Sequence, residues 1–401
     1  MAQIIERKAY LEQLILWQEK ELIKVVTGVR RCGKSTLFML FIDYLKKQGV
    51  LNSQIVSINL EDENFSHLRN YKQLHDYIES HIVDKAWTYV FIDEVQNCAE
   101  YERAIASLYL RENVDIYLTG SNAHLLSGEL ATKLTARYVQ IDMLPLSFLE
   151  FGELVTVSDR RDRFNLYLSG GGFPYAAKLI DNTLAHHQYL EGIYNTVLVK
   201  DVLTRKGIND TTLLKSITSF LADNIGNPVS AKKIADYLSS RGRPTGSATV
   251  DGYLEALCDA YLFYKVNRYD IKGKLHLRTE PKYYICDLGL RNMIVGTANK
   301  DIGRQIEGMV YLELLRRGYR VTIGKSGRGT EVDFIAFRDG ATEYYQVSAS
   351  VLDPDTLTRE LTSLTHIKDN YPKYLITLDE HTANHSGVEQ INLIDWLGTE
   401  Q

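Results

Sequence analysis

The sequence predicts an α/β fold in which a parallel sheet is followed by helical segments and by a second, smaller α/β segment. Three observations lead to this prediction. Nearly continuous apolar strands alternate with helical periodicity up to residue 121. Strand patterns then disappear until an aromatic hairpin pattern begins near residue 261. The order helix-strand-strand-strand-helix-strand follows over 303–378. We expect four domains, at 1–150, 151–208, 209–288 and 289–401.

The first domain is predicted to begin with a helix, because apolar residues recur at helical spacing over 4–20. The strand 22–28 then runs into a glycine turn. Further on, the pattern predicts helices at 34–48, 71–83 and 101–111, and strands at 54–60, 88–93 and 116–121. This alternation is typical of a parallel sheet that is covered by helices on both faces.

The later domains show three different patterns. Residues 151–208 are predicted to be helical, with interruptions at the glycine run 170–172 and at Pro174. Helices near 211–223, 230–240 and 247–260, followed by a hairpin over 261–287, are the layout of a winged helix-turn-helix. The last domain is predicted to contain helices at 303–317 and 355–370 and strands at 319–324, 331–338, 343–349 and 374–378.

Composition excludes several classes of protein. The chain has 401 residues, 45% hydrophobic and 24% charged, which is ordinary for globular domains. A net charge of −5 excludes a uniformly basic nucleic-acid coat. The four cysteines are too widely spaced for a zinc knuckle and fit reduced thiols. No apolar stretch is long enough for a membrane span, so we expect a cytoplasmic protein without a membrane partner.

A phosphate-binding loop follows the first strand. Residues 28–35 match the pattern G-x-x-x-x-G-K-[ST], and Thr36 follows: Gly28, Val29, Arg30, Arg31, Cys32, Gly33, Lys34 and Ser35. The glycines let the backbone wrap around phosphate, where the N–H groups and the helix N-terminus form an anion site. Lys34 should reach the β- and γ-phosphates, and the Ser35 hydroxyl should ligate Mg²⁺. Arg30 and Arg31 lie inside the loop, where they could also pair with acids at its base.

An acidic pair ends the strand 88–93. At the carboxyl edge of a parallel sheet, Asp93 should hold Mg²⁺ and Glu94 should activate the attacking water. The polar end of the next strand, residues 119–122, is predicted to touch the γ-phosphate or the water, with an ordinary turn as the alternative. Arg137 is a candidate for neutralising transition-state charge, either in cis or toward a neighbouring subunit in an oligomer.

These motifs together resemble the AAA-type ATP-binding proteins of bacteria and archaea that carry a C-terminal domain of unknown function. The resemblance runs through TGVRRCGKSTL, VFIDEVQN, YLTGSNA, ARYVQIDMLPLSFLEF, GGFP, GRQIEGMVYLELLRRGY, EVDFIAF and YYQVS, and so covers nearly the whole chain. It implies ATP as the nucleotide, Glu94 as the catalytic acid and Ser121 or Asn122 as the polar sensor. It also implies that residues 172–174 are the G-x-P of a helical lid.

The winged-helix segment is the most basic part of the chain. Residues 200–282 contain 14 lysines and arginines against nine aspartates and glutamates, a local charge of +5. The basic residues that could follow DNA phosphates are Lys232, Lys233, Arg241, Arg243, Arg268, Lys272 and Lys274. Charge alone does not identify a partner, so DNA and a protein partner both stay open.

The last domain resembles the restriction-endonuclease-like fold, in which clustered acids and an E-x-K motif hold Mg²⁺. Glu307 and Asp333 match the acids, but Gln346 and Ser348 stand where glutamate and lysine are required. Lys325 on the preceding strand is the alternative source of a lysine. Three hypotheses follow: a nucleotide-dependent switch that hydrolyses ATP, an ATP-regulated nuclease, and a scaffold that turns ATP over slowly. The first fits the residues best, since Glu94 is not needed for binding alone.

Overall fold

The computed structural model describes residues 4–123, 137–203, 210–271, 273, 275–296, 301–325 and 330–399, with the side chains of 275–279 outside the description. The chain forms two compact units. One consists of Met1–Met143 with Asp259–Tyr261, and the other of Leu144–Cys258 with Leu262–Gln401. Among the described residues, no helix has the length and apolar content that crossing a membrane requires.

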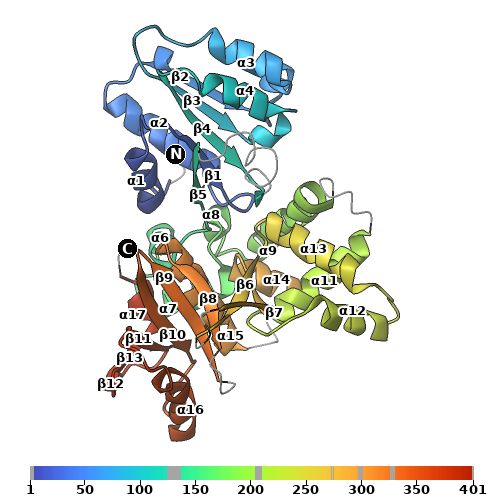
Figure 1. The fold of residues 1–401 in the computed structure, drawn as a ribbon, viewed down its shortest axis with the longest axis vertical. Helices are drawn as coiled ribbons and strands as arrows, with labels where there is room; N and C mark the ends of the chain where they lie inside the picture. The colour runs from blue at the N-terminus through green and yellow to red at the C-terminus, as the bar shows by residue number, and fades with distance from the viewer. Residues whose placement is uncertain are drawn as a thin grey trace. The chain divides into compact units, whose positions relative to one another are not determined.

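The first unit is built on a five-stranded parallel sheet (Figure 1). Its strands are β1 (Ile23–Thr27), β2 (Ile55–Asn59), β3 (Thr88–Asp93), β4 (Val114–Gly120) and β5 (Tyr138–Asp142), in the order β2-β3-β4-β1-β5. The four predicted strands are confirmed. The fifth, β5, was not predicted, because this edge strand buries only Ile141 among its five residues and so lacks an apolar run.

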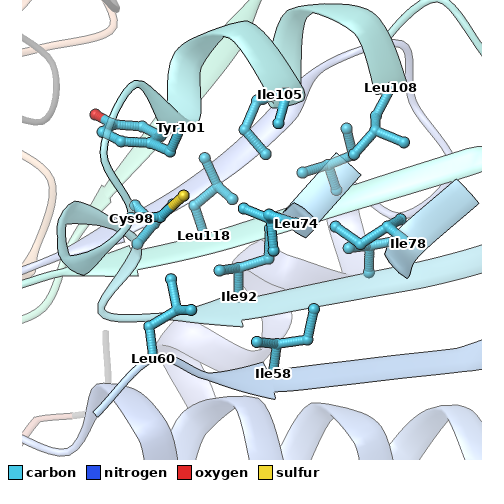
Figure 2. Packing of buried hydrophobic residues seen from close by; sticks show 14 of the residues in the cluster. Ile58, Leu60, Leu74, Ile78, Ile92, Cys98, Tyr101, Ile105, Leu108 and Leu118 are labelled. Carbon is cyan, nitrogen blue, oxygen red and sulfur yellow. The ribbon is translucent and has the colours of Figure 1, made fainter. Parts of the chain in front are cut away.

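Helices cover both faces of this sheet. The helices are α1 (Lys8–Leu16), α2 (Lys34–Lys47), α3 (Tyr71–Glu79) and α4 (Tyr101–Leu108). Figure 2 shows one face, where the strand residues Ile92 and Leu118 pack with Leu74 and Ile105 from α3 and α4. Their strand neighbours point the other way. The rings of Phe91 and Tyr117 therefore stack at 4.7 Å between centroids and pack with aromatic rings of α2.

A fully buried ion pair joins two central strands. The ammonium group of Lys24 on β1 pairs with Asp115 on β4, and both side chains have no exposed surface. The second oxygen of Asp115 accepts hydrogen bonds from the Tyr117 hydroxyl at 2.6 Å and the Glu19 backbone at 2.8 Å. Such a pair tolerates burial only because the remaining lone pairs are satisfied.

The second unit begins with helices. They are α6 (Phe148–Leu154), α7 (Arg160–Gly170), α8 (Pro174–Ala177) and α9 (Thr183–Thr196), with a π-helical segment at Val197–Leu203. The three helices predicted next are confirmed as α11 (Thr211–Asp223), α12 (Ala231–Ser240) and α13 (Ser247–Asp259). A short helix, α14 (Leu288–Val295), then follows the hairpin.

The glycine run before Pro174 is fixed by the cap of α14. Asp287 accepts the backbone N–H of Leu290 at 2.9 Å and that of Gly172 at 2.5 Å. Gly171 has a φ of +76°, and a Cβ there would lie 2.2 Å from Oδ1 of Asp287. Only glycine tolerates both the conformation and the close approach. This motif therefore binds an acid within its own unit.

One eight-stranded sheet runs through the rest of the second unit. Its order is β12-β13-β11-β10-β9-β8-β6-β7. The strands are β6 (Phe263–Asp270), β7 (Leu275–Ile285), β8 (Arg320–Lys325), β9 (Glu331–Arg338), β10 (Ala341–Val347), β11 (Lys373–Thr377), β12 (Ala383–His385) and β13 (Val388–Asn392). The helices are α15 (Ile302–Arg316), α16 (Pro354–Thr365) and α17 (Leu393–Leu397).

The predicted hairpin β6–β7 belongs to this same sheet. Strand β6 pairs in parallel with β8, with Arg268 beside Ile323. The hairpin that closes the segment 209–288 is therefore continuous with the strands of 289–401, and the finer division into four domains stays a prediction. The short elements β12, β13 and α17 were not predicted, because three to five residues give too little periodicity.

Candidate functional site

The phosphate-binding loop connects β1 to α2 through two glycines in unusual conformations. Gly28 has a φ of +146°, and a Cβ there would lie 2.1 Å from the carbonyl oxygen of Met143. Gly33, the N-cap of α2, has a φ of +113°. Without a side chain at either position, the loop closes tightly onto the helix, and the backbone N–H groups of its first turn can face an anion.

The lysine of the loop is held by the loop itself. The buried ammonium group of Lys34 donates to the carbonyl oxygens of Gly28 at 3.0 Å and Val29 at 3.3 Å. Its nitrogen also lies 3.9 Å from Oε1 of Glu94. The predicted phosphate-binding cation and the predicted catalytic acid are therefore neighbours, although 60 residues separate them in sequence.

The two predicted metal ligands are in contact. Burial raises the pKa of Asp93, while hydrogen bonds from the hydroxyls of Thr119 and Ser35 act in the opposite direction. Both hydroxyls thus point at the same carboxylate, which ends β3. Thr119 also accepts the backbone N–H of Glu94 at 2.9 Å. This threonine on β4 therefore holds both members of the acidic pair.

Glu94 has a strained backbone and a buried side chain. Its φ is +53°, a left-handed conformation that is uncommon for residues other than glycine. The carboxylate accepts hydrogen bonds from Gln96 and, at 3.3 Å, from the Ser121 hydroxyl. Asn122, the other predicted sensor, is also buried beyond the end of β4. The polar strand end thus contacts the acidic pair through Thr119 and Ser121, and its contact with the γ-phosphate or the attacking water stays a prediction.

The two arginines of the loop differ in environment. Arg30 is buried, donates to Oε1 of Glu61 at 2.7 Å and lies 4.0 Å from Oε2 of Glu94. It therefore pairs with acids, which was one of the two predicted roles. Arg31 is exposed, with a φ of +71°. Ser35 is exposed and Thr36 half-buried at the start of α2.

One loop contact was missed from the sequence. The buried side chain of Arg7, just before α1, donates to the carbonyl oxygen of Cys32 at 2.9 Å. The guanidinium also lies over the ring of Tyr10, 4.9 Å from its centroid. No motif in the first ten residues marks this role, because the contact depends on how α1 packs beside α2.

Arg137 does not reach the other predicted site residues. It precedes β5, and its carbonyl accepts the backbone N–H of Ile23 at 2.8 Å, at the start of β1. The phosphate-binding loop leaves the opposite end of that strand. The guanidinium lies over the ring of Tyr109, 5.2 Å from its centroid. Arg137 is therefore separated from the phosphate-binding loop of its own chain by the length of a strand. Only its role toward a neighbouring subunit stays a prediction.

Comparison with known proteins agrees with this geometry. Residues 20–152 match the family model described as an AAA domain, and residues 161–301 match a domain of unknown function. The chain is 40% identical to an uncharacterized protein of Haemophilus influenzae, over 98% of both chains. It belongs to the AAA-type P-loop ATP-binding proteins.

Two further similarities concern archaeal proteins. An uncharacterized protein of Methanocaldococcus jannaschii is 28% identical, over 93% of this chain and 85% of that one. The structure of a Walker-type ATPase of Pyrococcus abyssi covers 73% of this chain and 96% of its own, with a TM-score of 0.53 and 16% identity. At that identity the likeness shows that the two proteins share a fold. The five-stranded parallel sheet is typical of P-loop nucleotide-binding proteins.

The acids of the second unit in this AAA-type protein face a lysine that was not predicted. Lys282 on β7 pairs with Oε1 of Glu307 at 2.9 Å and Oε1 of Glu331 at 2.8 Å, and lies 3.8 Å from Asp333. Lys325, the alternative source of a lysine, is exposed at the end of β8. No group of three or more His, Cys, Asp and Glu residues in the described part of the chain forms a site that could hold a metal ion.

The basic surface is smaller than predicted. Arg268 is buried and pairs with Glu280 at 3.3 Å and Glu331 at 2.9 Å, so the prediction that it follows phosphates is wrong. Lys272 and Lys274 lie outside the described residues. Four of the predicted cations are exposed: Lys232, Lys233, Arg241 and Arg243. The sequence gives the number of charged residues but not which of them form ion pairs inside the fold.

Proposed function

We propose that this protein binds ATP with Mg²⁺, hydrolyses it, and uses its nucleotide state to control contact with DNA or with a protein partner. One observation carries the hydrolytic part. Lys34, Ser35, Asp93 and Glu94 form one hydrogen-bonded and charged network, built from the first turn of α2 and the end of β3. Binding alone needs the first two of these residues, whereas a buried acid beside them is what water activation requires.

The donor set fits Mg²⁺, which prefers hard oxygen ligands. The Ser35 hydroxyl and the Asp93 carboxylate are already in contact and would hold the ion. When bound, Mg²⁺ would offset the negative charge of the nucleotide phosphates. Lys34 would exchange the carbonyls of Gly28 and Val29 for phosphate oxygens, a change that ends in a stronger, charge-assisted interaction.

Glu94 is proposed as the general base. Its carboxylate is buried, is oriented by Gln96 and Ser121, and lies at the same strand edge as the lysine of the loop. A base held in this way needs little reorganisation when it takes the proton of the attacking water. Arg30, at 4.0 Å, limits the range of positions that the carboxylate can take.

The test compares Glu94→Gln with a matched control, Glu63→Gln, in which the altered side chain is 85% exposed in the same unit. Glu94→Gln should keep nucleotide affinity while turnover of MgATP falls by about two to four orders of magnitude, the usual range for a lost general base. Lys34→Ala should lose binding itself. Wild-type turnover in Glu94→Gln would show that another group is the base.

The proposed partner contact rests on the segment 209–288. Between α11 and α12 the chain pairs with β7: Gly226 donates to the Tyr283 carbonyl at 3.2 Å and Val229 to the Pro281 carbonyl at 3.0 Å. Three helices, one short paired segment and a hairpin are the parts of a winged helix. The four exposed cations on and after α12 favour DNA phosphates as the partner.

A protein partner is the second candidate, because α13 exposes two acids. In a winged helix this third helix enters the major groove, where Asp251 and Glu255 would face phosphates. Turnover of MgATP with and without duplex DNA, across a salt series, separates the two candidates. Stimulation that fades with salt, and whose salt slope falls by about two in Arg241→Gln/Arg243→Gln, supports DNA. Turnover that ignores DNA at every salt concentration supports a protein.

A further inference from the structure

The carboxylates of the second unit converge on a single ammonium group. Lys282 comes from the hairpin strand β7, Glu307 from α15, and Glu331 and Asp333 from β9. All three acids lie within 4 Å of the same nitrogen. The side chain of the lysine is 5% exposed. A cation thus lies where a nuclease of the similar fold would hold its divalent metal.

Two of these carboxylates also accept hydrogen bonds from other groups. The Tyr284 hydroxyl donates to Oε1 of Glu307 at 2.5 Å, and the backbone N–H of Val347 donates to Oδ2 of Asp333 at 2.9 Å. The other oxygen of Glu307 faces Gly226, where even a Cβ would approach it to 3.1 Å. This side of the site therefore leaves no space for a hydrated ion.

The residues at the positions of the E-x-K motif do not supply metal ligands either. Gln346 donates to Oε2 of Glu360 at 2.7 Å and accepts the Ser363 hydroxyl at 3.2 Å. The Ser348 hydroxyl donates to the carbonyl of Ser350 at 3.0 Å. The amide oxygen of Gln346 also accepts the backbone N–H of Asp333 at 3.3 Å. Both side chains are therefore already engaged in protein hydrogen bonds, and the set does not fit a divalent cation.

Two cations of the protein, Lys282 and Arg268, face three acids, and burial together with the charge of Glu307 raises the pKa of the third acid, Asp333. Lys282 and Arg268 together face Glu307 and Glu331. Burial lowers the pKa of Lys282, but the neighbouring acids Glu307, Asp333 and Glu331 raise it above its ordinary value, so the ammonium stays charged. A divalent ion would have to displace this cation and compete for oxygens that already accept hydrogen bonds.

We propose that Lys282 permanently replaces the divalent metal of a nuclease-like centre, converting it into an ion-pair lock. The lock joins β7 to α15 and β9, so that the hairpin and the C-terminal strands of the second unit behave as one body. On this account the second unit does not cleave nucleic acid.

Manganese titration of the nucleotide-free protein tests the proposal. Four proteins are compared by calorimetry: wild type, Asp333→Asn, Lys282→Met, and Lys282→Met/Asp333→Asn. Methionine keeps the length and most of the volume of lysine without its charge. We expect wild type and Asp333→Asn to bind Mn²⁺ identically. Lys282→Met should gain a site that the double variant loses, because Glu307 and Asp333 are then left without their cation, although Arg268 still pairs with Glu331.

Two results would overturn the lock. One is Mn²⁺ binding by wild type that Asp333→Asn abolishes, and the other is Mn²⁺-dependent plasmid cleavage with the same dependence. If Lys282→Met does not fold, the comparison of wild type with Asp333→Asn still decides between a lock and a metal site. Hydrogen exchange gives an independent readout: Glu307→Gln should speed amide exchange in β6 and β7 while leaving β1 and β3 unchanged.

Discussion

Removing one hydroxyl group, that of Thr119, should uncouple turnover from nucleotide binding. Thr119→Val keeps the shape of the side chain but deletes the donor to Asp93 and the acceptor for the Glu94 backbone N–H. A buried N–H left without a partner costs about 1–3 kcal/mol, and the lost charge-assisted bond costs a similar amount. We therefore expect the unfolding free energy to fall by roughly 2–6 kcal/mol. A catalytic acid displaced by about 1 Å can lose roughly 10²-fold in turnover.

The assay measures three quantities on one preparation: urea unfolding, affinity for a fluorescent ATP analogue and the rate of MgATP hydrolysis. Thr119→Ser is the matched control, because it keeps the hydroxyl and should retain most of the activity. Affinity should change little in Thr119→Val, since Lys34 and the loop glycines remain. If Thr119→Val hydrolyses ATP at the wild-type rate with unchanged stability, then Thr119 does not position the acidic pair.

Three other perturbations have defined outcomes. Asp115→Ala should lower the free energy of unfolding in urea by about 3–5 kcal/mol, because Lys24 is left buried and unpaired. Replacing both residues by an apolar pair should lower it far less. Equal losses in the two variants would refute this account. Gly28→Ala should abolish nucleotide binding, because its Cβ meets the Met143 carbonyl, and retained binding would contradict the loop geometry. Burial raises the pKa of Asp287 to about 6, so its contribution to stability is full below about pH 4 and is lost as pH rises through 6. Asp287→Asn should remove about 3 kcal/mol of that pH dependence in unfolding experiments between pH 4 and 7, and an unchanged slope would show that another group titrates.

The two ends of the chain differ in what their acids do. In the first unit, Asp93 and Glu94 face hydroxyls and a lysine that phosphate can recruit. In the second unit, Glu307 and Asp333 face a lysine that other acids retain. The same residue types thus favour ligand exchange in one place and a permanent internal contact in the other.

Some misplaced predictions have a common cause. The net charge of the segment 200–282 was counted correctly, but Arg268 and Lys282 form ion pairs inside the fold. Arg137 was predicted to neutralise transition-state charge in cis or toward a neighbouring subunit, whereas the register of β5 puts it at the other end of its own sheet. Neither burial nor register is visible in a list of residues.

The sequence by itself was enough to predict the proposed nucleotide site. Gly28 to Ser35 are consecutive, the acids directly follow an apolar strand, and local chemistry is enough to predict what such segments bind. Tertiary structure alone decided the contacts of Thr119, Arg7 and Lys282, whose partners lie at least 25 residues away. The physical reason is that a single side chain acquires a specific partner only through strand register and helix packing. Register and packing depend on the summed burial of many residues, so no single residue in the sequence indicates them.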